Sequence, residues 1–384
     1  MTTIFVQPSP WQRARHVLTD FDATLLGAMA VLAIIGLVAM YSAGFDHGTR
    51  FVDHARNMAL ALAVTFVVAQ VPPHKMERLA VPLYTVGVLL LVAVALFGIT
   101  RKGATRWLNL GVVIQPSEIM KIAMPLMLAW WFQKRESQLR AIDFLVAALL
   151  LALPVGLVAR QPDLGTAILI LAAGLYVIFF AGLSWRIVLP VALLAVAGIA
   201  ALVLAQEQIC DSGVRWPVLR EYQQHRVCTL LDPARDPLGK GFHILQGMIA
   251  IGSGGLAGKG FMEGTQTHLE FIPERTTDFI FAAFCEEFGF VGVVVLLVAL
   301  SVLILRGLAI AADAPTVFSR LLAGAVTMGF FTYAFVNMGM VSGILPVVGV
   351  PLPFVSYGGT AMVMLGLGLG ILMSVARSRQ LMRS

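Results

Sequence analysis

Carboxylates and cations stand close together at the edges of apolar stretches in this 384-residue sequence. The side chains concerned are Arg106, Glu118, Lys121, Asp163, Glu274, Arg275 and Asp278. Charged groups at membrane depth are costly and normally face a cavity or a charged partner. A carboxylate can take the proton of an attacking hydroxyl, while nearby cations hold an anionic group. These residue types therefore permit general-base catalysis next to a bound anion.

Four apolar stretches begin with proline beside a polar residue or a second proline. They open with Gln115-Pro116-Ser117-Glu118, Gln161-Pro162-Asp163, Pro273-Glu274-Arg275-Thr276-Thr277-Asp278 and Pro351-Leu352-Pro353. Proline suits the first turn of a helix, and the N-terminal end of a helix attracts anions, including phosphate. The pattern predicts helix N-termini that face an anionic ligand. Ordinary helix initiation and capping is the alternative.

Two of the acids also have purely structural alternatives. Glu118 and Lys121 are three residues apart on one helix face, so they can neutralise each other as an ion pair. Asp163 can cap its own helix or pair with Arg160. Either arrangement would leave these carboxylates without a role in chemistry.

Asp278 lies close to the start of another apolar stretch. Glu286 follows eight residues later and falls about 80° round the same helix, whereas Glu287 falls about 180° away. Asp278 and Glu286 are therefore expected to be able to face one cavity, which Glu287 cannot join. A capping aspartate is the structural alternative.

Composition identifies lipid as the main solvent of the chain. Hydrophobic residues make up 59% and charged residues 12%, against roughly 45–50% and about 25% in soluble domains. Ten stretches are apolar and long enough to cross a bilayer, at about 22–44, 55–72, 79–99, 117–133, 142–159, 163–182, 186–206, 277–307, 316–342 and 355–376. We predict an all-α polytopic membrane protein with about ten transmembrane helices. It comprises an N-terminal segment over 1–21 and a single membrane domain over 22–384, with a long loop over 207–276.

Basic residues in the short loops predict the orientation. Thirteen Lys and Arg residues lie on the side of the N-terminus, and six lie opposite, namely Arg50, Arg56, Arg101, Lys102, Arg106 and Arg160. Cytoplasmic loops carry the excess of Lys and Arg. Both termini and the 1–21 segment are therefore expected in the cytoplasm, and the 207–276 loop outside. No long basic run is present, so we expect no nucleic-acid partner.

Two parts of the outer side remain open to interpretation. The cluster from Arg101 to Trp107 places three cations against the charge bias, either to capture an anionic group or as solvated loop charge with an interfacial Trp. Within the long loop, the glycine-rich run 251–260 is best explained by turns with positive φ. Cys210 and Cys228 both lie in this outward loop, so a disulfide is permitted.

Five segments together resemble the SEDS family (shape, elongation, division, sporulation) of bacterial cell-wall polymerases. They are Gly103–Trp107, Gln115–Lys121, Gln161–Thr166, Pro273–Ala282 and Leu352–Gly359. The stretch from Asn337 to Pro351 is similar to the elongation-type, RodA-like branch. One departure is Thr276, where relatives often carry His, so a model that gives that His an essential acid–base role is in doubt here.

The resemblance implies a peptidoglycan glycosyltransferase of the bacterial inner membrane that polymerises lipid II at the outer leaflet during elongation. Its ligands would be lipid II and undecaprenyl diphosphate. Its partners would be a class B penicillin-binding protein, which is a transpeptidase, and other membrane proteins of the elongation complex. The alternatives are a lipid-precursor flippase or transporter, since intramembrane acids and proline-broken helices also suit alternating access, and a non-catalytic scaffold for the transpeptidase.

The family motif assigns the general base to Asp278, which the charge pattern also singles out. The expected reaction is an inverting transfer, in which Asp278 takes the proton of the acceptor hydroxyl. Substrate contacts are expected from Arg106, Trp107, Glu118, Lys121, Asp163, Glu274 and Arg275. Glu118 and Asp163 are candidate ligands of a divalent cation, Mg²⁺ or Mn²⁺, which is the alternative to side-chain cations for stabilising the leaving diphosphate.

Overall fold

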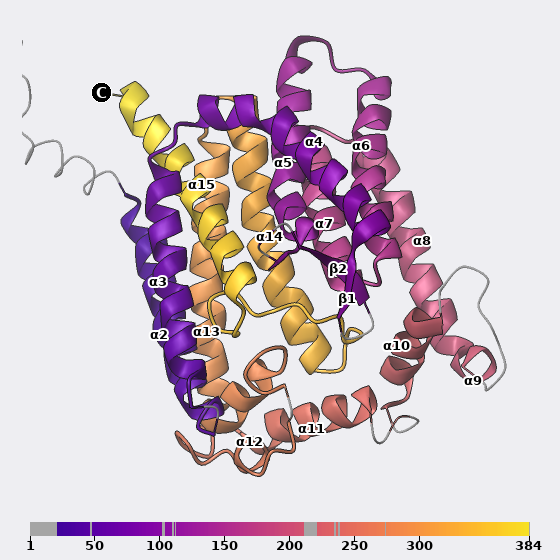
Figure 1. Cartoon of the computed structure of the whole chain (residues 1–384), viewed down its shortest axis with the longest axis vertical. Coiled ribbons are helices and arrows are strands. Elements are labelled where there is room, and N and C mark those ends of the chain that lie inside the picture. Colours follow the sequence, from indigo (N-terminus) through magenta and orange to yellow (C-terminus); the bar gives the residue numbers. More distant parts are fainter. Residues whose placement is uncertain are drawn as a thin grey trace, which may run out of the picture.

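The computed structural model is a bundle of long helices with one small sheet (Figure 1). It describes residues 21–383 apart from 47, 102–103, 110, 112, 211–220, 234–235, 237–238 and 273. Residues 1–20 of the predicted N-terminal segment, together with Lys102 and Pro273, therefore lie outside the described residues. The long helices are α2 (Ala23–Ala43), α3 (Arg50–Ala69), α4 (Pro73–Phe97), α5 (Pro116–Lys134), α6 (Ala141–Arg160), α7 (Leu164–Phe180), α8 (Trp185–Leu204), α13 (Ile280–Ala312), α14 (Val317–Val341) and α15 (Gly359–Arg383).

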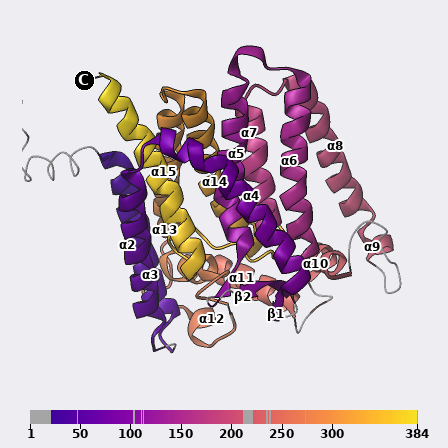
Figure 2. The same cartoon turned by 45° about the horizontal axis from the view of Figure 1, so that its top comes forward.

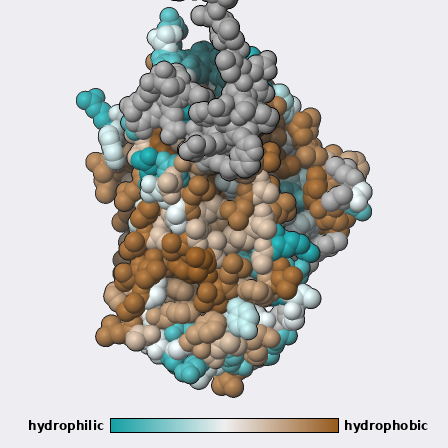
Figure 3. All heavy atoms as spheres, turned by 90° about the vertical axis from the view of Figure 1, so that its left-hand side faces the viewer, coloured by the Kyte–Doolittle hydropathy of each residue, from teal (hydrophilic) through white to brown (hydrophobic). Residues whose placement is uncertain are grey.

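Most of these helices have the properties of membrane spans. Within the described part of the chain, eight are long and apolar enough to cross a bilayer. The remaining two are α7, which is shorter, and α5, which carries buried charges; both pack into the bundle interior. Figure 3 shows hydrophobic side chains gathered over the middle of one face and hydrophilic ones near its lower end. The prediction of an all-α polytopic membrane protein is confirmed.

The predicted spans match the observed helices closely. α2, α5, α6, α7, α8 and α14 begin and end within two residues of the sequence-based limits. The largest errors at a helix start are at α3 and α4, which begin five and six residues earlier than predicted. Their first turns carry polar residues, Arg50, Asp53 and His54 in α3 and His74 and Lys75 in α4, which lower the local hydropathy.

The helices run between two distinct ends of the molecule (Figures 1 and 2). The start of α2 and the end of α15 lie together at one end. The opposite end carries a small antiparallel sheet of β1 (Ile99–Arg101), β2 (Ala104–Asn109) and β3 (Val113–Ile114). The sequence did not predict these strands, which are short and sit in a span-to-span connection.

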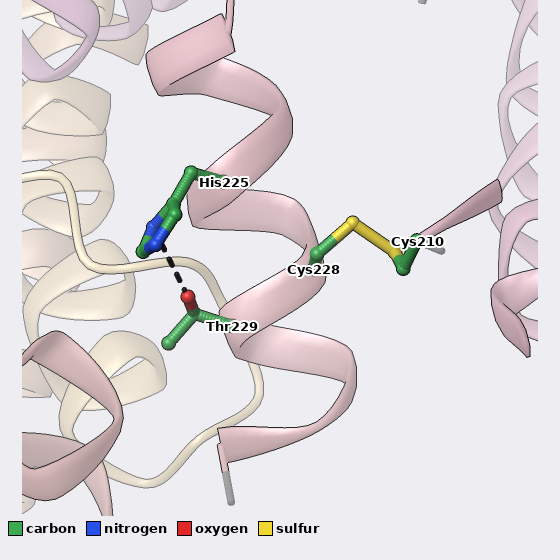
Figure 4. Close-up of a disulfide and its surroundings, with 4 residues drawn as sticks. All are labelled: Cys210, His225, Cys228 and Thr229. Atoms are coloured by element: carbon green, nitrogen blue, oxygen red, sulfur yellow. Dashed lines mark hydrogen bonds between the residues drawn. A yellow bond between two sulfur atoms is a disulfide. The ribbon is translucent and has the colours of Figure 1, made fainter. Parts of the chain in front are cut away.

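The described part of the predicted 207–276 loop contains short helices and lies at the same end as the sheet (Figure 2). It contains α9 (Gln206–Ile209), α10 (Glu221–Leu231), α11 (Lys240–Ser253) and α12 (Thr265–His268). A disulfide joins Cys210, just after α9, to Cys228 of α10, where His225 and Thr229 also bond to each other at 3.3 Å (Figure 4). The permitted disulfide is thus formed.

The glycine-rich run 251–260 packs its backbone against the backbone of α13, a helix that is interrupted at Gly289. α13 contains a non-helical residue, Gly289, and the amides of Lys259 and Gly260 donate to the carbonyls of Glu286 and Glu287 at 3.0 and 3.1 Å. A Cβ added at Gly258 would lie 2.0 Å from the Glu287 carbonyl oxygen. Backbone is therefore packed directly on backbone, and positive φ is only part of the reason for these glycines.

Candidate active site

Asp278 lies in the turn that leads into α13, where it is half-buried. Asn337 of α14 donates from Nδ2 to the Asp278 carbonyl at 3.0 Å and to the Val350 carbonyl at 2.8 Å. Gly349, with φ +76°, brings its backbone so near that an added Cβ would lie 3.3 Å from Asp278 Oδ2. One asparagine thus fixes both the turn and the loop over 342–358, and glycine lets the loop approach the carboxylate.

The predicted pair of Glu118 and Lys121 is formed on α5 at 2.7 Å. Both side chains are buried, and Lys121 Nζ also donates to the Tyr333 hydroxyl at 2.8 Å. Tyr333 and Asn337 are four residues apart on α14 and share a face. The same face of α14 therefore contacts both the ion pair and the backbone of Asp278.

Asp163 connects a third element to the site. Its Oδ1 accepts from the Thr166 amide at 3.3 Å, so it caps α7 as the structural alternative predicted. Its carboxylate also accepts from Gln115 at 2.8 Å and lies 3.6 Å from Arg106 of β2. Strand β2 therefore places Arg106 beside the N-terminal ends of α5 and α7. Trp107, the next residue of β2, is half-buried and pairs with Ile99 of β1, and its contact with substrate stays a prediction.

Helix α3 also contributes a residue to the site, and this residue was not among those predicted from the sequence. Arg50, the first residue of α3, donates to Thr276 Oγ1, and its guanidinium lies 5.6 Å from the centre of the Tyr357 ring. The Tyr357 amide donates to the Thr276 carbonyl at 2.9 Å. A cation therefore contacts the Asp278 turn at Thr276.

Arg275 and Glu274, two residues predicted to contact substrate, make contacts that hold the Asp278 turn in place. Arg275 is 3% exposed, donates from Nε to the Ala43 carbonyl at 3.0 Å and pairs with Asp46. It therefore fastens the α2–α3 connection to the Asp278 turn. Glu274 is exposed and accepts from the Thr277 hydroxyl at 2.6 Å. Contact of either residue with substrate stays a prediction.

Glu286 and Glu287 are both held by neighbouring protein groups. Glu286 accepts from Lys259 Nζ at 2.7 Å, from the Gln266 amide at 2.9 Å and from the Thr267 amide at 3.2 Å. Glu287 accepts from the Ser42 hydroxyl of α2. The idea that Asp278 and Glu286 share a cavity is therefore wrong, because the folded-back loop covers Glu286.

The side chains offer little support for a metal ion held by protein alone. The described residues contain no group of three His, Cys, Asp or Glu side chains suited to a metal ion. Glu118 and Asp163 each face a cation, although Glu118 Oε2 is buried without a hydrogen-bond partner in the described structure. A divalent cation would thus need diphosphate oxygens as further ligands, as Mg²⁺ often uses. The predicted cation stays a prediction.

The space beside the Glu118–Lys121 pair is too small for a sugar. A cavity of about 50 Å³ lies between α5, α7, α14 and α15. Its walls are apolar except at Lys121 and Tyr333. A water needs roughly 10–15 Å³ of such space. A sugar therefore does not fit into this cavity.

Comparisons with known proteins agree along almost the whole chain. The FtsW/RodA/SpoVE family model, described as "Cell cycle protein", matches residues 18–381. The peptidoglycan glycosyltransferase MrdB of Escherichia coli K12 is 47% identical over 363 residues, covering 94% of this chain and 95% of that protein.

Two solved structures are also similar to this chain along almost its whole length. One described as "Structural coordination of polymerization and crosslinking by a peptidoglycan synthase complex" has a TM-score of 0.76 at 35% identity, covering 94% of this chain and 98% of that one. The rod shape determining protein RodA of Thermus thermophilus has a TM-score of 0.68 at 30% identity, covering 94% and 97%.

Proposed function

The chain belongs to the FtsW/RodA/SpoVE family, on its RodA-like side, and we propose that it polymerises lipid II at the outer leaflet with Asp278 as general base. The broader activity follows from its relatives, so this multi-pass membrane protein is a peptidoglycan glycosyltransferase. The observation that carries the proposal is the position of Asp278. It is half-buried, held through its backbone by Asn337, and approached by the loop over 342–358.

In the proposed reaction, a hydroxyl of the acceptor sugar attacks the anomeric carbon of the donor. Asp278 takes the hydroxyl proton, a new glycosidic bond forms, and the bond from the anomeric carbon to the diphosphate oxygen breaks. The diphosphate leaves with the electron pair of that bond. Attack from the face opposite the leaving group inverts the anomeric centre. General base catalysis is typically worth about 10²–10⁴-fold in rate.

The leaving diphosphate gathers negative charge, which cations held in place can stabilise. Arg106 and Lys121 are the candidates. Arg106 lies 3.6 Å from Asp163, and Lys121 donates to Tyr333, which is four residues before the asparagine that bonds the Asp278 carbonyl. Their carboxylate partners fix them before substrate arrives, so little reorganisation is needed during the reaction. Glu118 and Asp163 therefore act in this proposal as positioning residues.

We further propose that Asp278 faces the cell exterior from the bacterial inner membrane, with both termini in the cytoplasm. The distribution of Lys and Arg supports this orientation. The Cys210–Cys228 disulfide adds support, because disulfides persist in oxidising compartments such as the periplasm. It lies at the end of the molecule that carries the sheet.

A complex with a class B penicillin-binding protein is part of the proposal. Glycan strands need crosslinking after they are polymerised, and one similar solved structure belongs to a peptidoglycan synthase complex that coordinates the two steps. A transpeptidase in the same membrane would receive the new strand at its site of synthesis.

The test is polymerisation of fluorescent lipid II by purified protein, alone and with the transpeptidase, resolved on gels. Asp278→Asn should keep the folded state and lose at least about 10²-fold in rate. Glu270→Gln is the matched control, since it changes an exposed acid eight residues before Asp278. Polymer of normal length from Asp278→Ala would reject the assignment. Translocation of lipid II across vesicles without polymer would favour a flippase.

A further inference from the structure

Helix α10 contacts the loop that approaches Asp278. Arg226 of α10 is half-buried and donates from Nη1 to the Val347 carbonyl at 3.0 Å. Gly349, two residues further along, is the position where an added Cβ would lie 3.3 Å from Asp278 Oδ2. A hydrogen bond from a charged donor is stronger than one between neutral groups. The contact therefore fixes the backbone of the loop two residues from the point where it meets the carboxylate.

Two membrane helices hold the same segment of the loop. Asn337 of α14 donates to the Val350 carbonyl at 2.8 Å. A Cβ added at Gly165 of α7 would lie 2.7 Å from the Val348 carbonyl oxygen, so α7 packs directly against this backbone. Of the three helices that hold the segment, α10 is the one that lies in the 207–276 loop and not among the long helices. Its grip on the loop therefore depends on what ties α10 to the bundle.

The disulfide ties α10 to a membrane helix on the side opposite to Arg226. Cys228 and Arg226 are two residues apart, so they lie about 200° apart round α10. Cys228 points toward Cys210, which follows α9 at the end of α8 (Figure 4). The α10 helix has 11 residues, a length that is marginally stable in water without tertiary support. The crosslink therefore limits the movement of α10, and Arg226 transmits that restraint to the loop.

We propose that the Cys210–Cys228 disulfide is a redox-sensitive restraint, which keeps the loop over 342–358 against Asp278 through Arg226. The proposal rests on the proposed function, since it concerns regulation of the same site. An external dithiol breaks the S–S bond: the two sulfurs gain two electrons and two protons, and the dithiol is oxidised to a disulfide. Both cysteines are partly exposed, so a small dithiol can reach them. Arg226 then leaves the Val347 carbonyl more often, and Asp278 is correctly positioned for a smaller fraction of the time.

The first test compares lipid II polymerisation by the oxidised protein and by the protein reduced with dithiothreitol. At saturating lipid II, reduction should slow the wild-type protein about tenfold, as expected for a lost hydrogen bond from a charged donor, whereas KM should change little. Reoxidation should restore the rate. The double variant Cys210→Ser with Cys228→Ser should polymerise at the reduced wild-type rate under both conditions. Cys285→Ser is the control and should respond like wild type, because Cys285 is a buried free thiol of α13.

Replacing Arg226 shows whether the disulfide acts through the loop. Arg226→Ala should be slow and should no longer respond to dithiothreitol, because the contact that transmits the restraint is already absent. Arg226→Lys keeps the charge and should retain part of the rate. Arg56→Ala is the matched control, since Arg56 is 74% exposed and pairs with Asp53 on its own helix. A tenfold effect of dithiothreitol that persists in Arg226→Ala would overturn the proposal, because the disulfide would then act on stability alone.

Amide hydrogen exchange gives a second readout, which does not require activity. Reduction should speed exchange in the loop over 342–358 about tenfold in wild type, and should have no further effect in Arg226→Ala. Equal exchange in oxidised and reduced wild type would overturn the proposal. So would faster exchange with an unchanged polymerisation rate, since the loop would then not position Asp278. If wild type makes no polymer, the proposed function fails, while the exchange comparison still decides whether the disulfide restrains the loop.

Discussion

Replacing Lys121 with methionine should both destabilise the bundle and slow polymerisation, and a second substitution separates the two effects. The Lys121 and Glu118 side chains are 8% and 10% exposed, with 2.7 Å between Nζ and Oε1. Removing one partner of a buried ion pair leaves the other charge unpaired, which costs about 3–5 kcal/mol. Tyr333 also loses its bond from Lys121. We expect Lys121→Met to lower the free energy of unfolding by that amount.

The double variant Glu118→Gln with Lys121→Met removes both charges together. Replacing both members of a buried ion pair with uncharged side chains often leaves the free energy of unfolding almost unchanged. The double variant should therefore recover most of the stability that Lys121→Met loses. Its polymerisation rate should stay about 10²–10³-fold low, because the preorganised cation for the leaving diphosphate is still missing. Thermal unfolding in detergent measures the first effect, and lipid II polymerisation measures the second.

Each measurement can refute one step of this reasoning. Wild-type stability in Lys121→Met would show that the Glu118 carboxylate is not left unpaired. A double variant that polymerises at the wild-type rate would show that Lys121 is a structural residue, with no contact to the reacting groups. Lys121→Arg keeps the charge at a different size and should retain more activity than Lys121→Met.

Three further predictions concern other parts of the chain. Loss of the Cys210–Cys228 disulfide in a double serine variant should lower the stability of the oxidised protein by about 3 kcal/mol, with Cys285→Ser as the control; equal unfolding temperatures would contradict this. Gly258→Ala should lower the free energy of unfolding by more than about 2 kcal/mol, because φ is +81° and the new methyl group would collide with backbone atoms. Gly252→Ala is the control, since its methyl group would have open space and the variant should unfold like wild type. Removal of divalent cations with EDTA should slow polymerisation until Mg²⁺ or Mn²⁺ is restored; an unchanged rate would remove the metal from the proposal.

Features that depend on neighbouring residues could be predicted from the order of amino acids alone. Apolar runs of bilayer length predicted the spans, since the thickness of the membrane sets the length of each helix. The three-residue spacing of Glu118 and Lys121 predicted their ion pair, and the position of Asp163 before an apolar run predicted a helix cap. Motif resemblance then identified Asp278 as the base to be tested. All of these are local patterns that one helix or one motif can carry.

Which helices meet, and hence which distant residues complete the site, became known from the folded chain. Tyr333 lies 212 residues from Lys121, and Arg50 lies 226 residues before Thr276. The fold also assigned Glu286 to the folded-back loop and away from Asp278. The physical reason is that lipid is as apolar as a helix interface, so hydrophobic periodicity does not distinguish a packed face from a lipid-facing one. Packing geometry between helices settles that choice.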